Sequence, residues 1–207
     1  MLIVFEGIDG SGKSTLSNSF GHYINNDFRS EDGALKVDPH LGDFIWTKEP
    51  TFTTEEADEL NSSACTDQFS RERLFFESRL RHQDLIAGRN IICDRYIWSG
   101  IAYAKKFSPE CFGFAKELYL SENLFIQPDL YVFVDTPVVV CHERDTSVDM
   151  DRLMSLRQAY IETEQYIKVP IIQMQAVDGE EEALKVLINK FEWHVSHYNL
   201  SVEDSEW

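Results

Sequence analysis

The sequence is poor in cysteine and in basic residues, and it contains no long apolar run. The only cysteines are Cys65, Cys93, Cys111 and Cys141. Because they are widely spaced and form no C-x-x-C pair, we expect reduced thiols in a reducing cytoplasm rather than a disulfide framework. No apolar stretch approaches the roughly 20 residues that a membrane-spanning helix needs. The run Met1–Phe5 stops at Glu6 and is too short for a signal peptide, so we expect a cytoplasmic protein that binds no membrane.

Acidic residues outnumber basic ones by 36 to 19, which gives the 207-residue chain a formal net charge of −17. A surface this acidic repels nucleic acid and anionic membranes, so we expect neither as a partner. Any anionic ligand must therefore be held in a local basic pocket. Residues 66–106 are the candidate region, because basic residues outnumber acidic ones there while the rest of the chain is strongly acidic.

Short apolar runs alternate with longer helical stretches along the chain. The runs are continuous, as expected for strands that helices cover on both faces. The predicted strands are 2–5, 91–93, 130–134, 171–174 and, more weakly, 44–47. The predicted helices are 14–28, one that opens at Thr53 or Thr54, 66–87, 109–123, 150–168 and 179–198. This order predicts an α/β fold with a five-stranded parallel sheet between helical layers, one domain over residues 1–199 and an acidic tail over 200–207.

A phosphate-binding motif follows the first predicted strand. The stretch from Gly7 to Ser14 matches G-x-x-x-x-G-K-[ST], and a helical pattern begins directly after it, which is the context that the motif requires. The glycines let backbone N–H groups point inward, and the helix N-terminus adds partial positive charge. Lys13 can bridge the β- and γ-phosphates of a nucleoside triphosphate, and the Ser14 hydroxyl can ligate Mg²⁺. The predicted ATP-binding residues are Gly7, Ile8, Asp9, Gly10, Ser11, Gly12, Lys13, Ser14 and Thr15.

Motifs typical of two other nucleotide-binding classes are missing. A GTPase would carry N-K-x-D, but the similar stretch Asn189–Glu192 lacks the aspartate and lies in the last predicted helix. A motor ATPase would carry a strand that ends in Asp-Glu, whereas strand 91–93 is followed by Asp94 and Arg95. Arg95 therefore lies where ligands bind in open parallel sheets, and its planar guanidinium suits phosphate oxygens. We predict that Asp94 holds Mg²⁺ through water or orients Arg95.

Four segments resemble the thymidylate kinase family in sequence, order and spacing. Phe5–Thr15 resembles the opening of that family, and Asp94–Tyr103 resembles its D-R-Y-x-x-S-x-x-A-Y segment. Between them, Thr47–Pro50 resembles T-R-E-P, and Phe75 followed four residues later by Arg79 resembles the base-recognition helix. The resemblance covers about residues 1–170. It implies a three-layer P-loop kinase fold that phosphorylates dTMP to dTDP with ATP and Mg²⁺.

The resemblance also implies roles for individual residues. Phe75 would stack on the thymine ring, and Arg79 would donate a hydrogen bond to a base carbonyl. Asp9 would accept a hydrogen bond from the sugar 3′-hydroxyl, and Tyr103 would crowd the 2′ position. The implied substrate-binding residues are Asp9, Lys48, Pro50, Phe75, Arg79, Arg95, Ser99, Gly100 and Tyr103. The implied catalytic residues are Lys13, Asp94, Arg95, Arg144 and Arg152, and the metal ligands are Ser14 and Asp94.

A short lid is implied just after the fourth predicted strand, at about residues 140–151. Family members that have a glycine at the position of Gly10 supply a catalytic arginine from this lid. Arg144 is the first candidate for that arginine and Arg152 the second, while Arg157 resembles a helix arginine that flanks the lid. The family commonly forms homodimers, so the resemblance implies a homodimer.

Three departures from the family keep other functions open. The lid is short and acidic, Lys48 replaces the arginine of T-R-E-P, and Thr51 and Phe52 replace two glycines. The main alternative is a deoxynucleoside kinase, in which Glu49 would deprotonate the acceptor 5′-hydroxyl, or a deoxynucleoside monophosphate kinase of broader specificity. A nucleotide-binding module without catalysis is the third hypothesis.

Overall fold

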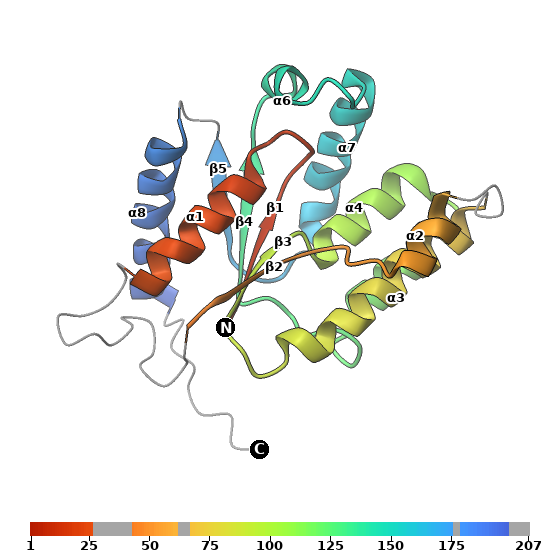
Figure 1. Cartoon of the computed structure of the whole chain (residues 1–207), viewed down its shortest axis with the longest axis horizontal. Coiled ribbons are helices and arrows are strands. Elements are labelled where there is room, and N and C mark those ends of the chain that lie inside the picture. Colours follow the sequence, from red (N-terminus) through yellow and green to blue (C-terminus); the bar gives the residue numbers. More distant parts are fainter. Residues whose placement is uncertain (27–42, 62–66, 176–178, 199–207) are drawn as a thin grey trace.

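The computed structural model describes residues 1–26, 43–61, 67–175 and 179–198 (Figure 1). Within these ranges, parallel strands form one sheet in the order β2-β3-β1-β4-β5. The strands are β1 (Leu2–Glu6), β2 (Ile45–Lys48), β3 (Ile91–Asp94), β4 (Leu130–Asp135) and β5 (Ile171–Gln175). Each predicted apolar run forms one of these strands, so the predicted five-stranded parallel sheet is confirmed.

Helices cover both faces of the sheet (Figure 1). On one face, α1 (Lys13–Asn26) and α8 (Glu180–Tyr198) pack against Ile3 and Phe5 of β1. The other face buries Leu2 and Val4 under α3 (Gln68–Ile86), α4 (Ile97–Phe107), α5 (Phe112–Tyr119) and α7 (Met150–Thr163). The smaller elements are α2 (Thr54–Asn61), α6 (Val138–Arg144) and the 3₁₀ turn η1 (Glu164–Tyr166). Burial on both faces is the reason why the strand sequences are continuously apolar.

The strand register gathers polar residues at one edge of the sheet. Phe5 of β1 and Lys48 of β2 are both paired with Asp94, the last residue of β3. All strands are parallel, so the segments that follow β1, β2 and β3 leave the sheet at the same edge. Ligands bind beyond this edge in open parallel sheets.

Two helices, α4 and α6, are absent from the sequence prediction. Most of α4 is buried, including Trp98, Ile101 and Ala102, but its first turn holds Ser99 and Gly100, which are weak helix formers. With seven residues, α6 is too short to show a period. The predicted helices 66–87, 109–123 and 150–168 are real but shorter at one or both ends. In the first of these, the Asp67 carboxylate caps the helix by accepting a hydrogen bond from Ser70 N at 2.9 Å.

A buried carboxylate joins the sheet to α4. The N-cap residue of α4, Tyr96, has no side-chain cap, but Glu6 at the end of β1 takes that place. Its Oε1 accepts hydrogen bonds from Tyr96 N at 2.9 Å and from Ser99 N at 3.0 Å. Its Oε2 accepts from Ser99 Oγ and, at 3.0 Å, from the Tyr160 hydroxyl of α7. Burial raises the pKa of Glu6 despite these donors.

The remaining predictions about the whole chain fall partly outside the described ranges. No helix of the described residues is long and apolar enough to span a bilayer. Cys93, Cys111 and Cys141 are buried free thiols, whereas Cys65 and the acidic tail lie outside the described residues.

Candidate active site

The phosphate-binding loop connects β1 to α1 and packs tightly against the end of β4 and against α6. Gly10 has a φ of 75°, and a Cβ added there would lie 2.4 Å from the carbonyl oxygen of Cys141. Gly7, with a φ of 152°, would place a Cβ 2.6 Å from the carbonyl oxygen of Val134. Only glycine fits these two positions, because any side chain would clash with backbone that cannot move aside.

Lys13 begins α1 and points back over the loop. Its Nζ donates to the carbonyl oxygen of Ile8 at 3.3 Å and lies 3.9 Å from Asp9 Oδ1. Burial, with a contribution from Arg95, lowers the pKa of Lys13 to about 8. A bound polyphosphate would stabilise the charged ammonium, so this lysine is built to gain a negative partner.

Asp94 faces the loop from the end of β3. The Ser14 hydroxyl donates to its Oδ2, and Lys48 Nζ lies 3.6 Å from the same oxygen. The other oxygen, Oδ1, is buried and has no hydrogen-bond partner among the described residues. A carboxylate oxygen without a donor beside a loop hydroxyl fits a Mg²⁺ ion, which binds few protein ligands and keeps substrate phosphates and water. The described residues contain no group of three or more acidic, histidine or cysteine side chains that could hold a metal ion.

On the other side of the loop lies a pocket of about 210 Å³ between α1, α8 and the ends of β4 and β5. It is lined by Ser11, Gly12, Thr15, Leu16, Val134, Thr136, Arg144, Met174, Gln175, Gly179, Glu180 and Ala183. Residues 176–179 follow the last strand, and this position predicts that they contact the adenine of the donor. Gly179 lines this pocket, whereas 176–178 lie outside the described residues.

A second cavity, of about 260 Å³, opens beyond the carboxyl ends of β1, β2 and β3. We call it the acceptor cavity. It is lined by Asp9, Lys13, Lys48, Glu49, Pro50, Glu72, Phe75, Arg79, Arg95, Ser99, Gly100 and Tyr103. All nine substrate-binding residues implied by the resemblance are in this set. The structure thus brings together residues from four separate segments of the sequence.

Arg95 forms the floor of the acceptor cavity. Its Nη2 lies 2.5 Å from Asp9 Oδ1, and its Nη1 donates to Ser99 Oγ at 3.3 Å and to the Tyr160 hydroxyl at 3.1 Å. Its backbone has a φ of 72°, which is rare for a residue with a side chain. Burial alone would raise the pKa of Asp9, but Arg95 and Lys13 outweigh it and lower that pKa. Tyr103 completes the group, because its hydroxyl donates to Asp9 Oδ2 at 3.2 Å.

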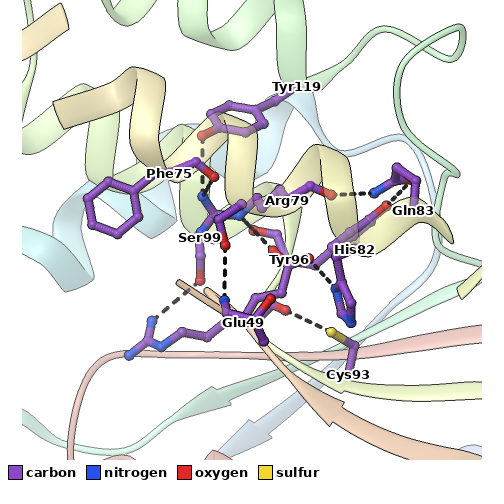
Figure 2. Close-up of polar contacts among 12 residues, drawn as sticks. Glu49, Phe75, Arg79, His82, Gln83, Cys93, Tyr96, Ser99 and Tyr119 are labelled. Atoms are coloured by element: carbon purple, nitrogen blue, oxygen red, sulfur yellow. Dashed lines mark hydrogen bonds and ion pairs between the residues drawn. The ribbon is translucent and has the colours of Figure 1, made fainter. Parts of the chain in front are cut away.

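Arg79 and Phe75 form the opposite wall of the cavity, on α3 (Figure 2). Arg79 is buried: its Nε donates to the carbonyl oxygen of Tyr96 at 3.1 Å, and its Nη1 donates to the Tyr119 hydroxyl at 3.2 Å. Burial would lower the pKa of Arg79, but Tyr119, Glu49 and more distant carboxylates raise it overall. Phe75 is half-buried and lines the cavity instead of packing in the core.

Gly100 and Phe52 shape the cavity beside these two residues. A Cβ at Gly100 would lie 2.7 Å from the Tyr119 ring, so the glycine lets Tyr119 approach α4 and reach Arg79. Phe52 replaces one of the glycines that follow T-R-E-P in the family. Its ring packs edge-on against Phe75, with ring centroids 5.2 Å apart.

Comparison with known proteins agrees with this geometry. The family model described as Thymidylate kinase matches residues 5–187. The chain belongs to the thymidylate kinase family. It is 32% identical over 155 residues to the thymidylate kinase of Mesomycoplasma hyopneumoniae strain 7448, which covers 70% of this chain and 69% of that protein. It is 30% identical over 193 residues to the probable thymidylate kinase of Methanocaldococcus jannaschii, which covers 87% of this chain and 90% of that protein.

The fold is that of a solved thymidylate kinase as well. The crystal structure of thymidylate kinase from Ehrlichia chaffeensis superposes with a TM-score of 0.67 at 21% identity, covering 93% of this chain and 98% of that chain. The resemblance seen in the sequence and the predicted kinase fold are therefore confirmed.

The two arginines proposed for the lid from the thymidylate kinase resemblance make different contacts in the structure. Arg144, at the end of α6, donates from Nη1 to the carbonyl oxygens of Gly10 at 3.2 Å and Ser11 at 3.4 Å. Arg152, on α7, instead stacks on the Phe107 ring at 4.4 Å from its centroid. Only the first of the two reaches the phosphate-binding loop.

Arg157 holds the lid helices to the sheet of this thymidylate kinase family member. Its Nε and Nη2 lie 2.6 and 2.7 Å from the two carboxylate oxygens of Asp135, which ends β4. This bidentate ion pair fixes α7 against the end of β4.

Four residues of this site were given no role by the sequence analysis. Tyr160 accepts a hydrogen bond from Arg95 and donates one to Glu6. Their only signal in the sequence is a charged or phenolic group among apolar residues. Glu72 lies on the same helical face as Phe75 and Arg79, so helical spacing would have found it. His82 lies one turn beyond Arg79 on α3 and contacts Glu49.

Proposed function

We propose that this chain catalyses the ATP-dependent phosphorylation of dTMP to dTDP. Family membership points to this reaction, and the acceptor cavity is the observation that carries it in structural terms. The cations Lys13, Lys48 and Arg95 line the cavity beside Asp9 and Asp94, and Phe75 and Arg79 line it from α3. A nucleoside monophosphate has groups that suit both sets of residues, a dianionic phosphate at one end and a flat hydrogen-bonding base at the other.

The acceptor nucleotide is oriented by both sets of residues. Arg95 binds the acceptor phosphate through its planar fork, assisted by Lys48. Phe75 stacks on the base while Arg79 donates to a base carbonyl oxygen. Asp9 accepts from the 3′-hydroxyl, and Tyr103, which is fixed by its bond to Asp9, leaves no room for a 2′-hydroxyl.

The donor nucleotide lies along the loop and the pocket beside α1 and α8. Loop N–H groups and Lys13 hold the β- and γ-phosphates, and Arg144 approaches the transferring group from the lid. An acceptor phosphate oxygen attacks the γ-phosphorus, the bond to the β,γ-bridging oxygen breaks, and dTDP and ADP leave. Ser14 and Asp94 would hold Mg²⁺, which when bound neutralises charge on the β- and γ-phosphates.

The competing assignment as a deoxynucleoside kinase needs Glu49 as a free base near the acceptor hydroxyl. Glu49 is fully buried, its Oε1 is bound by His82, and its Oε2 lies 3.0 Å from Arg79 Nε. Both carboxylate oxygens lie against basic side chains of α3, so Glu49 is placed as a partner of Arg79 and His82 and not as a free general base. The structure therefore favours a monophosphate as acceptor.

An ADP-release assay with ATP and Mg²⁺ tests the proposal. The acceptors are dTMP, dUMP, dCMP, dAMP, dGMP, UMP and thymidine. We expect strong turnover with dTMP and little with UMP or thymidine. Turnover with thymidine in preference to dTMP would make the chain a nucleoside kinase, and ATP binding without any transfer would make it a non-catalytic module.

We also propose a single catalytic domain over residues 1–199, a homodimer and a cytoplasmic location. Family resemblance supports the dimer, and α3 carries the exposed apolar side chains Phe69, Leu80 and Leu85. The buried free thiols support a reducing compartment. Sedimentation equilibrium distinguishes a dimer from a monomer directly.

A further inference from the structure

A buried histidine–carboxylate pair lies directly behind Arg79 (Figure 2). Glu49 follows β2, and its carboxylate is completely buried at the wall of the acceptor cavity. His82 of α3 is buried too, and its Nδ1 contacts Glu49 Oε1. On the far side of the ring, Nε2 lies 2.8 Å from the hydroxyl of Thr47, which belongs to β2.

The two partners of the ring fix its orientation. A carboxylate only accepts hydrogen bonds, so Nδ1 donates to Glu49. Nε2 pairs with the Thr47 hydroxyl, which can either donate or accept. The imidazole is thus oriented from both sides and holds the carboxylate in one rotamer.

The carboxylate in turn lies against the guanidinium of Arg79. Glu49 Oε2 is 3.0 Å from Arg79 Nε, but that N–H is directed at the carbonyl oxygen of Tyr96, so the carboxylate acts here as a counter-charge and not as an acceptor. Nε and Nη1 of Arg79 are both bound to protein oxygens. Among the described residues, Nη2 has no hydrogen-bond partner, and it is the donor that is left for a ligand in the cavity.

We propose that His82 is a positioning residue for acceptor specificity: through Glu49 it holds Arg79 so that Nη2 presents a donor to the base. A fixed N–H favours a base with a keto oxygen at that position, such as thymine, and disfavours one with an amino group, such as cytosine. This inference rests on the proposed function, because it assumes that the base lies against Arg79.

A pair of substitutions at His82 tests the relay. Asparagine places its amide nitrogen where Nδ1 lies, so His82→Asn keeps the donor to Glu49 and loses only the contact with Thr47. His82→Leu removes both contacts in a side chain of similar bulk. The measurements are kcat and KM with dTMP and with dCMP, together with KM for ATP and the thermal midpoint of unfolding.

We expect His82→Leu to lower the preference for dTMP over dCMP by ~10-fold, mainly through KM for dTMP, since a lost hydrogen bond to a charged group costs about that factor. KM for ATP stays near the wild-type value. His82→Asn keeps most of the preference. A purely structural role would lower stability and kcat for both nucleotides alike and leave their ratio unchanged. Such an unchanged ratio, or an equal loss in the asparagine variant, would overturn the proposal.

Thr47→Val provides a second route if His82→Leu does not fold. It removes the hydroxyl from the far side of the ring and keeps the shape of the side chain. We expect a smaller fall in the dTMP preference in the same direction, and an unchanged preference would count against the relay. The wild-type chain serves as reference in every series: absence of dTDP there would defeat the proposed function, whereas dTDP formation with unaltered selectivity in the variants would defeat only this inference.

Discussion

The acceptor cavity differs in construction from the pocket beside α1 and α8, which we call the donor pocket because we propose that ATP binds there. Both adjoin the phosphate-binding loop. Three charged residues that line the acceptor cavity are buried: Glu49 is 0% exposed, Arg79 is 3% and Arg95 is 7% exposed. Each contacts a side chain from a neighbouring helix. Glu49 contacts His82 of α3, Arg79 binds Tyr119 of α5, and Arg95 binds Tyr160 of α7. In the donor pocket, Arg144, Gln175 and Glu180 are all exposed. The buried side chains of the acceptor cavity are therefore held in one geometry before a ligand binds. The donor pocket offers mainly backbone groups and exposed side chains.

The difference indicates where discrimination is made. Buried polar groups that are fixed in one geometry penalise any ligand that fails to match them, which gives strong selectivity. Exposed groups adjust at little cost and discriminate weakly. We therefore expect strict selection of the acceptor base and looser selection of the donor base. The following four experiments challenge or refine that contrast, beginning with the largest effect.

Lys13 belongs to the phosphate-binding loop and also lines the acceptor cavity, so its loss should affect both nucleotides. We expect Lys13→Ala to reduce turnover by at least ~10²-fold, since it removes a fixed charge from the transferring phosphates. The assay is dTDP formation at saturating ATP and dTMP. Near-normal turnover would remove this lysine from the mechanism, and circular dichroism provides the control for folding.

Substitutions at Arg144 and Arg152 test which arginine of the lid region takes part in phosphoryl transfer. We expect Arg144→Ala to lower kcat by about 10²-fold, because a lid arginine neutralises charge on the transferring group. Arg152→Ala, which loses a stacking contact with Phe107, should change kcat by less than about 10-fold. The reverse order of effects in matched kcat measurements would assign the catalytic role to Arg152.

Arg79→Ala tests the acceptor side alone. We expect KM for dTMP to rise by roughly 10- to 150-fold, which corresponds to about 1.5–3 kcal/mol for a hydrogen bond from a charged donor. KM for ATP should stay within a factor of about three because Arg79 lies in the acceptor cavity and not in the donor pocket. An equal rise in both KM values would show that the acceptor and donor sites do not bind their nucleotides independently.

A pH series gives the smallest effect and probes Lys13 in the free protein. Its pKa is about 8 in the folded chain and 10.5 when unperturbed, so between these values the unfolded chain holds a proton that the folded chain has lost. The free energy of unfolding should therefore rise with pH across this window, relative to Lys13→Met. ATP affinity should fall over the same window as the ammonium loses its charge. Urea denaturation and ATP titration at pH 8 and 10 measure both, and a slope of opposite sign in either one contradicts the assignment.

How much of this could be read from the sequence depends on how local each signal is. The strands, the loop Gly7–Thr15 and most helices carry their own patterns, so they could be predicted. Helix α4 was harder to predict, because Ser99 and Gly100 in its first turn are weak helix formers. The first layer of the acceptor cavity followed from family resemblance.

The supporting residues around that layer have no local signature. Glu6 and Tyr160 are 154 residues apart, and only the packing of α7 against the sheet brings them to Arg95. His82 looks like one more polar residue on α3 until β2 places Glu49 and Thr47 beside it. Residues that act by holding other residues become visible only when the fold is known.

The position of β1 has a consequence for how the protein is made. This strand is synthesised first, yet it lies in the middle of the sheet between β3 and β4, whose last residues are Asp94 and Asp135. The carboxylate at its end receives its last partner only when Tyr160 has emerged. A growing chain on the ribosome therefore carries the phosphate-binding sequence long before it has a phosphate-binding structure. A chain that ends before α7 lacks Tyr160, so the hydrogen bonds that hold Arg95 and Glu6 are complete only after α7 has been synthesised.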